Sequence, residues 1–215
     1  MEDRARSQEE ITQIGNPGKP RGEEGAQMLL RMNSSHFQVT DWALSFLRFR
    51  EEDSVLDIGC GGGAALKRIS RLVPDGHLTG VDYSDVSVKM SQEMNREEIR
   101  RGKTEILKAS VEKLPFEKNC FDKIITVESF YFWPDPAENL KEVLRILKVG
   151  GVFLLVADIY QKEGLSDSAL ENIARYQLFN PTLEEYHMLF KQAGFSDIKI
   201  HTEEGTDWIC VEGIK

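Results

Sequence analysis

The sequence has little cysteine and no obvious grouping of metal-binding residues. Its three cysteines, Cys60, Cys120 and Cys210, are widely separated, and no CxxC pair or Cys/His cluster accompanies them. Disulfide frameworks use an even number of patterned cysteines, and structural zinc sites use closely spaced ligands. The sequence therefore predicts no metal site and no disulfide framework, which is typical of a protein from the reducing cytoplasm.

Long apolar runs and an excess of positive charge are lacking as well. The longest apolar run is residues 152–157, whereas a transmembrane helix needs roughly 20 apolar residues. The N-terminus is charged and has no apolar signal region. Lys and Arg number 27 against 36 Asp and Glu, which gives a net charge of −9. Because nucleic acids and anionic membranes attract clustered cations, we expect neither as a partner, and we expect a cytoplasmic location.

What the chain does contain is enough apolar side chain for one core, since 40% of its 215 residues are hydrophobic and the length suits roughly one domain. Residues 1–25 are polar and rich in Gly and Pro, and they predict a flexible N-terminal arm without periodic structure. Residues 26–50 predict a helical lid, because Trp42 and Phe46 follow a helix-like spacing. Residues 51–215 predict the main domain.

Short β-branched runs alternate with helical segments in the main domain. Strands are predicted at residues 54–58, 77–82, 104–108, 121–127 and 152–157. A capping box at Thr182 and Glu185 begins a late helix, and two further runs, 195–203 and 208–214, predict a terminal hairpin. Strands that are apolar on both faces indicate a parallel sheet covered by helices on both sides. The predicted class is α/β, with a seven-stranded, mostly parallel sheet that has one antiparallel strand near the C-terminus.

A glycine turn directly follows the first predicted strand. The segment VLDIGCGGG, residues 55–63, ends with glycine at four of five positions. Gly59 and Gly61 let the backbone approach a ligand without a side chain in between. The carboxyl end of a central strand is also where open α/β sheets bind ligands. The alternative is a tight turn that needs glycine for its conformation alone.

A carboxylate follows about 20 residues later, at the end of the second predicted strand. Asp82 could accept hydrogen bonds from the two hydroxyls of a ribose, and Tyr83 beside it could lie against a purine. The alternative is that Asp82 caps the next helix and Tyr83 packs.

Taken in order, these segments resemble the class I S-adenosylmethionine-dependent methyltransferases. The matching pieces are VLDIGCGGG, GVDYS (80–84), SVEKLPF (110–116), Phe121-Asp122 and LRILKVGG (144–151). The sequence is most similar to the small-molecule branch that includes ubiquinone and menaquinone biosynthesis. The resemblance covers roughly residues 50–160. It implies a Rossmann-like fold, S-adenosyl-L-methionine as the cofactor and a small-molecule methyl acceptor.

The resemblance also implies a role for each matching residue of the turn and the second strand. Asp57, Gly59 and Gly61 would hold the methionine part of the cofactor. Asp82 would bind the ribose hydroxyls, and Tyr83 would cover the adenine.

At the third and fourth strands the match is less regular. Ser110 stands where the family usually has an Asp that takes the adenine amino group. A hydroxyl is a weaker acceptor than a carboxylate, so the Val111 backbone is the more dependable adenine contact. Glu128 and Ser129 would border the methionine end and the substrate.

Two other functions compete with methyl transfer. A nicotinamide-dependent oxidoreductase is one, because Gly59, Gly61 and Ala64 satisfy a loose dinucleotide fingerprint. Asp57 opposes it, since a carboxylate under the turn would repel a pyrophosphate, and the terminal hairpin is foreign to that sheet. A non-catalytic cofactor-binding module on the same fold is the second alternative.

The acceptor side offers fewer signals. No Asn-Pro-Pro-Tyr or Asp-Pro-Pro-Tyr tetrad follows the fourth strand and no Pro-Cys pair is present, which argues against methylation of adenine, glutamine or cytosine. The run FYFW, residues 130–133, predicts an apolar or cation-binding wall, with Tyr131 and Trp133 on one side if the segment is extended. Packing under the next helix is the alternative.

His36 is the candidate general base, because its unperturbed pKa is near 6.5, and Tyr131 is the second candidate catalytic residue. A structural or solvated His36 is the alternative. Asp158 and Tyr160 could contact substrate, and the sequence does not predict an oligomeric state.

Overall fold

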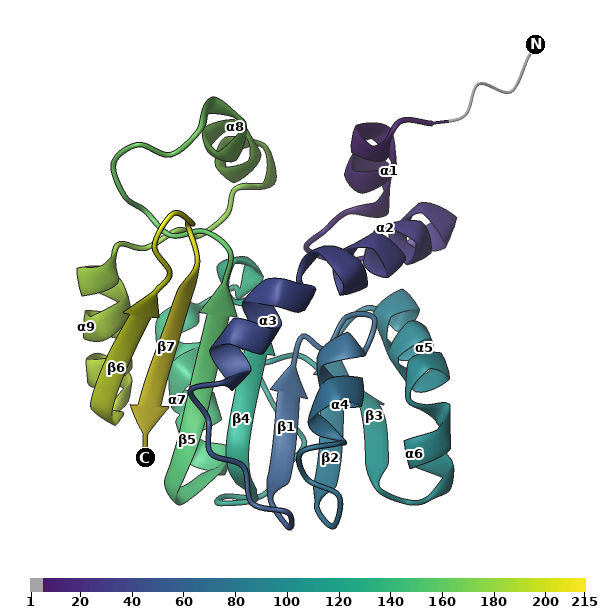
Figure 1. The fold of residues 1–215 in the computed structure, drawn as a ribbon, viewed down its shortest axis with the longest axis vertical. Helices are drawn as coiled ribbons and strands as arrows, with labels where there is room; N and C mark the ends of the chain where they lie inside the picture. The colour runs from purple at the N-terminus through teal and green to yellow at the C-terminus, as the bar shows by residue number, and fades with distance from the viewer. Residues whose placement is uncertain (1–5) are drawn as a thin grey trace.

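A single seven-stranded sheet runs through the middle of the protein. The computed structural model describes residues 6–215, and its strand order is β3-β2-β1-β4-β5-β7-β6 (Figure 1). The strands are β1 (Ser54–Ile58), β2 (His77–Asp82), β3 (Thr104–Lys108), β4 (Phe121–Val127), β5 (Leu147–Ala157), β6 (Ser196–Thr202) and β7 (Ile209–Ile214). β1 to β5 pair in parallel, and only β7 runs antiparallel to its neighbours β5 and β6. The α/β fold class predicted from the sequence is confirmed.

Helices cover both faces of this sheet. They are α1 (Gln8–Gly15), α2 (Gly22–Ser35), α3 (Phe37–Leu44), α4 (Ala64–Ile69), α5 (Asp85–Met94), α6 (Arg96–Arg100), α7 (Pro136–Ile146), α8 (Asp167–Tyr176) and α9 (Leu183–Ala193), with a 3-10 turn at Phe130–Phe132. The side chains of α7 and α9 share one apolar core with the sheet, whereas α3 and α4 share the other. The central strands are buried on both sides by these two cores, as parallel strands require. No helix among residues 6–215 has the length and apolar character needed to span a membrane.

Local capping explains where several helices begin. Asp135 accepts a hydrogen bond from the Glu138 backbone and Pro136 occupies the first turn of α7. Thr182 and Glu185 form the predicted capping box of α9. Each cap stabilises its helix by about 1 kcal/mol.

The sheet register brings the ends of three strands together. Asp57 of β1 pairs with Ile125 of β4, and Val127 of β4 pairs with Val156 of β5. The residues that follow these strands therefore emerge side by side at one edge of the sheet. Helices α1 and α2 lie above that edge, and α8 lies above it from the C-terminal half (Figure 1).

The N-terminal segment has more regular structure than the sequence indicated. Residues 1–25 were expected to lack periodic structure, but α1 occupies residues 8–15 and α2 already begins at Gly22. A capping box between Ser7 and Glu10 stabilises the start of α1, and a glycine- and proline-rich turn between the helices hides this pattern in the sequence. Residues 1–5 lie outside the described part, and flexibility of the arm stays a prediction.

Two further boundaries differ. The helix expected up to Arg50 ends at Leu44, and β5 begins at Leu147, five residues before the predicted start at Val152. Leu147 pairs with Phe121 of β4. Tertiary pairing therefore extends the strand through Gly150 and Gly151, although a glycine pair normally indicates a turn.

Candidate functional site

A cavity of about 390 Å³ lies at the carboxyl ends of β1, β2 and β4. We call it the glycine-turn cavity. Its lining includes every cofactor-binding candidate from the sequence: Asp57, Gly59, Gly61, Asp82, Tyr83, Ser110, Val111 and Glu128. His36 lines it as well, and its volume lies within the range of small-molecule sites. The structure thus brings together residues that are up to 92 positions apart in the chain, from His36 to Glu128.

The glycine turn is closed by backbone geometry that only glycine allows. Gly59 and Gly61 have φ values of +75° and +49°, and the Gly59 N–H donates to the Val81 carbonyl at 2.8 Å. A Cβ atom on Gly59 would lie 2.4 Å from the Ser129 hydroxyl oxygen. A side chain there would both strain the backbone and displace Ser129.

Asp57 is a buried carboxyl group with an oxygen atom that lacks a partner. It is 2% exposed, and its Oδ1 atom has no hydrogen-bond partner among the described residues. Burial, followed by the neighbouring charge of Asp82, raises the pKa of Asp57 to about 8. A ligand ammonium group beside it would stabilise the ionised form. The amino group of S-adenosylmethionine fits this position, whereas a pyrophosphate does not.

Asp82 already holds two backbone groups. Its Oδ2 atom accepts a hydrogen bond from the Gly61 N–H at 3.0 Å, and its Oδ1 atom accepts one from the Ser84 N–H at 2.9 Å. Burial raises the pKa of Asp82, and these two hydrogen bonds oppose that shift. Each carboxylate oxygen retains further lone-pair capacity, so stabilising the turn and binding a ribose are compatible.

The segment between α1 and α2 reaches this cavity, which the sequence did not indicate. The Tyr83 hydroxyl donates to the Gly18 carbonyl, and the Ser84 hydroxyl donates to the Pro20 carbonyl at 2.5 Å. The Lys19 ammonium lies 5.1 Å from the centre of the Tyr83 ring. No sequence motif marks these contacts, since they join positions 64 and 65 residues apart.

Ser110 and Val111, the predicted adenine contacts, line the glycine-turn cavity next to the polar side chain of Glu112. The Ser110 hydroxyl donates to Glu112 Oε2 at 2.9 Å and accepts from the Glu112 N–H at 3.3 Å. Val111 is 8% exposed. Because the Ser110 proton is engaged by Glu112, its oxygen can only accept further hydrogen bonds, as a contact to an amino group requires.

A second cavity, also of about 390 Å³, lies between α1, α2 and α8. We call it the helix cavity. Its lining includes Met28, Arg31, Tyr131, Asp158 and Tyr176. Five residues line both cavities: Pro17, Met32, His36, Glu128 and Phe132. We call these five the shared wall, because the two cavities adjoin there.

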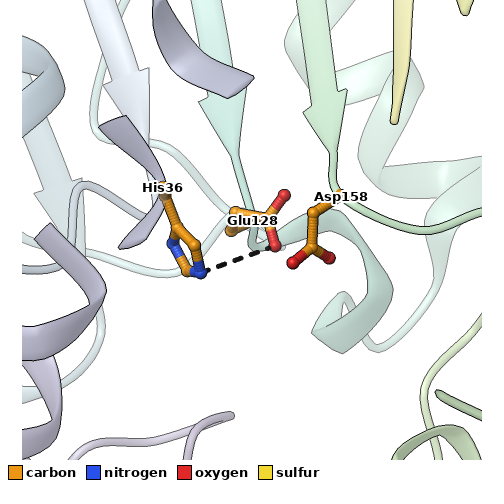
Figure 2. Close-up of side chains that lie close together, drawn as sticks. All are labelled: His36, Glu128 and Asp158. Carbon is orange, nitrogen blue, oxygen red and sulfur yellow. Dashed lines mark ion pairs between the residues drawn. The ribbon is translucent and has the colours of Figure 1, made fainter. Parts of the chain in front are cut away.

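His36 and Glu128 of the shared wall form a cluster with Asp158 (Figure 2). One nitrogen or carboxylate oxygen atom from each residue lies within 4.8 Å of the other two, and His36 Nε2 is 3.9 Å from Glu128 Oε2. Glu128 follows β4, Asp158 follows β5, and His36 joins α2 to α3. Glu128 has a φ of +55°, a costly conformation for a residue with a side chain. The strand ends and the N-terminal helices therefore both contribute to one polar site.

Burial dominates the electrostatics of this cluster. Burial, and then the nearby charge of Asp158, raise the pKa of Glu128 well above its usual value. Burial also lowers the pKa of His36, against an opposing effect of Asp158 and with a contribution from Arg31. The Tyr131 hydroxyl donates to Glu128 Oε2. His36 thus favours the neutral imidazole, which can accept a proton.

The expectation that Tyr131 and Trp133 share one side is wrong. Residues 130–132 form a 3-10 turn and not an extended segment, so Trp133 shares a side with Phe130, at a ring distance of 5.0 Å. Both residues belong to one apolar core, but Tyr131 lines the helix cavity, whereas Trp133 lines the glycine-turn cavity. A turn places positions three apart on one face.

Of the two further substrate candidates, Asp158 and Tyr160, only the first lies at a described cavity. Asp158 lines the helix cavity, but Tyr160 lines neither cavity, and its ring lies 5.2 Å from the Lys162 ammonium.

Comparison with known proteins agrees with this geometry. A family described as methyltransferase domain matches residues 56–155. The chloroplastic 2-methyl-6-phytyl-1,4-hydroquinone methyltransferase 2 of Oryza sativa subsp. japonica is 33% identical over 146 residues, which cover 68% of this chain and 40% of that protein. The uncharacterized methyltransferase YdaC of Bacillus subtilis (strain 168) is 24% identical over 169 residues, which cover 79% and 86%. The chain thus spans less than half the length of the rice relative.

The fold comparison points the same way. A structure of Haemonchus contortus phosphoethanolamine N-methyltransferase 2 in complex with S-adenosyl-L-methionine has a TM-score of 0.78 at 15% identity and covers 99% of this chain and 60% of that chain. YcgJ from Bacillus subtilis has a TM-score of 0.68 at 20% identity and covers 84% and 99%. No comparison supports a nicotinamide-dependent oxidoreductase. In its glycine turn, its seven-stranded sheet and its match to a methyltransferase domain over residues 56–155, the chain is similar to the S-adenosylmethionine-dependent methyltransferases.

Proposed function

We propose that this chain transfers a methyl group from S-adenosyl-L-methionine in the glycine-turn cavity to a small molecule in the helix cavity. The observation that carries the proposal is the shared wall. Two cavities of similar volume meet at five common residues, of which His36 and Glu128 are polar. Transfer between two small molecules requires such adjoining sites, because the reacting atoms have to come into contact.

On the donor side, Asp57, Gly59 and Gly61 would bind the methionine part of the cofactor. The unpartnered Oδ1 atom of Asp57 suits an ammonium group, and the glycines leave room for close approach of the backbone. The bound cofactor supplies a methyl group on a sulfonium, which is already activated for displacement. The protein therefore needs to orient the two molecules and exclude water.

The adenosine part would lie toward β2 and β3. Asp82 would accept hydrogen bonds from the ribose hydroxyls, Tyr83 would cover the adenine, and Ser110 with the Val111 backbone would contact its edge. Helix α2 would cover this ligand as the lid expected from residues 26–50, since Leu29, Met32 and Asn33 line the glycine-turn cavity.

On the acceptor side, the lining favours an apolar or aromatic body. Met28, Met32, Tyr131, Phe132 and Tyr176 all line the helix cavity. His36 is the proposed proton acceptor for the substrate, and Tyr131 is the second proposed catalytic residue, since it lines the cavity and donates to Glu128. The net charge of −9 supports a small-molecule substrate over a nucleic acid.

The test is to measure donor binding and methyl transfer separately. S-adenosylmethionine binding is measured by calorimetry, and transfer is followed with a labelled methyl donor and a metabolite extract. Binding together with labelling of a small molecule supports the enzyme. Tight binding without transfer to any acceptor would favour the non-catalytic module, and absence of binding would contradict the proposal altogether.

A further inference from the structure

The polar side of the helix cavity has carboxylates without a matching cation. Glu128, Asp158 and Asp207 line it, and Arg31 is its one guanidinium among the described residues. Arg31 is engaged by α1, because it donates to the Gln8 side chain at 2.9 Å and to the Thr12 hydroxyl at 2.6 Å. Asp207 is paired with Lys162 at 2.6 Å. Within residues 6–215, no Lys or Arg forms an ion pair with Glu128 or Asp158.

Of these two carboxylates, which have no Lys or Arg partner in the described part of the chain, Glu128 is more deeply buried than Asp158. It is 6% exposed, and its Oε1 atom has no hydrogen-bond partner among the described residues. Its carboxylate faces Asp158 and His36 (Figure 2). Glu128 is buried and Asp158 is exposed, and the two adjacent carboxylates repel each other when both are ionised. A cation bound between them would remove that repulsion, so the site favours a ligand that carries a positive charge.

We propose that the methyl acceptor is an amine, whose ammonium group binds between Glu128 and Asp158 and which is methylated on nitrogen. This inference rests on the proposed function and adds the chemical class of the acceptor to it.

The proposed step uses all three members of the cluster. The ammonium group loses a proton to the His36 imidazole, and the freed nitrogen lone pair forms a bond to the methyl carbon. The carbon–sulfur bond breaks with its electron pair remaining on sulfur, and the product is the methylated ammonium. Positive charge thus arrives at the nitrogen and at His36, where Glu128 and Asp158 stabilise it. An oxyanion acceptor would instead be repelled by the same two carboxylates.

A divalent metal ion is the other cation that such a cluster could hold. One observation favours the amine. The cavity continues past the cluster between apolar and aromatic side chains such as Met28 and Tyr176, which suits an organic body.

The test compares three probes of similar shape and different charge. Phenethylamine, 2-phenylethanol and phenylacetate are titrated by calorimetry into the protein loaded with S-adenosylhomocysteine. We expect phenethylamine to bind at least about tenfold more tightly than the other two. Equal or tighter binding of the alcohol or the acid overturns the inference. So does a failure of phenethylamine to bind at about 10 mM, because a charged site of this kind yields millimolar affinity.

Three variants assign the preference to the cluster. Glu128→Gln and Asp158→Asn should each reduce the preference for the amine to about threefold or less. Asp207→Asn is the matched control, since this carboxylate lines the same cavity but is paired with Lys162, and it should leave the preference intact. Asp158 is exposed, so its variant stays informative if Glu128→Gln fails to fold. A preference that survives both cluster variants overturns the inference.

Two controls separate this inference from its rivals. Binding of S-adenosylhomocysteine alone is measured first. Its absence contradicts the proposed function, whereas intact binding without amine preference contradicts only the amine. Titration with Mn²⁺ and Zn²⁺ tests the metal. Metal binding that His36→Ala abolishes, together with no preference among the organic probes, overturns the amine in favour of a metal site.

Discussion

The glycine-turn cavity and the helix cavity have similar volumes but are built in different ways. The first includes the glycine turn and the residues at the ends of adjacent parallel strands, and its key residues lie in contiguous motifs such as residues 55–63 and 80–84. The second is formed by side chains of helices α1, α2 and α8 with the residues that follow β4 and β5. The difference teaches that the fold itself determines the proposed donor site, whereas the packing of individual side chains determines the proposed acceptor site.

If backbone geometry builds the glycine-turn cavity, Gly59→Ala should have the largest effect of any single change. The new Cβ would lie 2.4 Å from the Ser129 hydroxyl oxygen at a φ of +75°, so we expect a loss of about 3–5 kcal/mol in unfolding free energy and loss of donor binding. Denaturant unfolding measures the first and calorimetry the second.

Gly205→Ala is the matched control for this change. Gly205 has nearly the same φ, +77°, but no atom lies within 4 Å of the added Cβ. We expect a cost of only about 1 kcal/mol from backbone strain. Similar losses in both variants would show that the cavity wall at Ser129 has no special role.

Asp82→Ala should weaken donor binding by about 1.5–3 kcal/mol, which is the loss expected for hydrogen bonds to a charged group. It should also lower stability, because Asp82 accepts from the Gly61 and Ser84 N–H groups. Asp85→Asn removes a surface carboxylate of α5 that pairs with Lys108, and it should leave donor affinity unchanged. Unchanged donor affinity in Asp82→Ala would contradict the assignment of Asp82 to the ribose.

The helix cavity should respond in the opposite way, with turnover affected and donor binding preserved. Tyr131→Phe removes the hydrogen bond to Glu128, and we expect kcat to fall about tenfold while donor affinity changes by less than about twofold. Tyr186→Phe is the control, because this buried hydroxyl has no hydrogen-bond partner among the described residues. Equal losses of donor binding and turnover in Tyr131→Phe would erase the distinction between the two cavities.

The smallest expected effect is a pH dependence of donor binding that Asp57 causes. With a pKa of about 8, its carboxyl is mostly protonated at pH 7 in the free protein, and an ammonium ligand favours the ionised form. Donor binding at pH 7 should therefore release up to roughly one proton. Affinity should rise only about two- to threefold between pH 7 and 8, because the α-amino group of the ligand, with a pKa of about 7.7–8.0, loses its proton over the same range. Calorimetry in buffers of different ionisation enthalpy measures the release, and Asp57→Asn should abolish it.

The same carboxyl affects stability without ligand, with a defined sign. Its folded pKa is raised above the unfolded value of 3.8, so the folded state binds its proton more tightly. The contribution of Asp57 therefore destabilises the fold progressively as pH rises from about 4 to about 8, and is constant above that window. Stability of Asp57→Asn should lack this component, and an unchanged pH profile would contradict the raised pKa.

The comparison of the two cavities also explains how far the sequence could predict this molecule. Sheet class, strand positions and the glycine turn follow from local periodicity and from glycines at adjacent positions, which depend on near neighbours. The sequence also predicted that Asp57 and Asp82 lie close together, because they stand at the ends of two neighbouring strands. Which ligand each of them binds stays a prediction.

The helix cavity could not be predicted in the same way, since its lining runs from Thr12 to Asp207. Residues 130–132 form a 3-10 turn and not the expected extended segment, so Trp133 does not lie on the same side as Tyr131. The contacts of Gly18 and Pro20 with the donor cavity depend on how α1 and α2 pack, which no local motif encodes.

The central claim is that the glycine-turn cavity holds the donor and the helix cavity holds the acceptor. A crystal structure with S-adenosylhomocysteine tests it most directly. The account predicts the ribose at Asp82, the amino group at Asp57 and the sulfur directed toward the shared wall at His36 and Glu128, with the helix cavity left open. A ligand in the helix cavity, or a sulfur directed away from the shared wall, would contradict it.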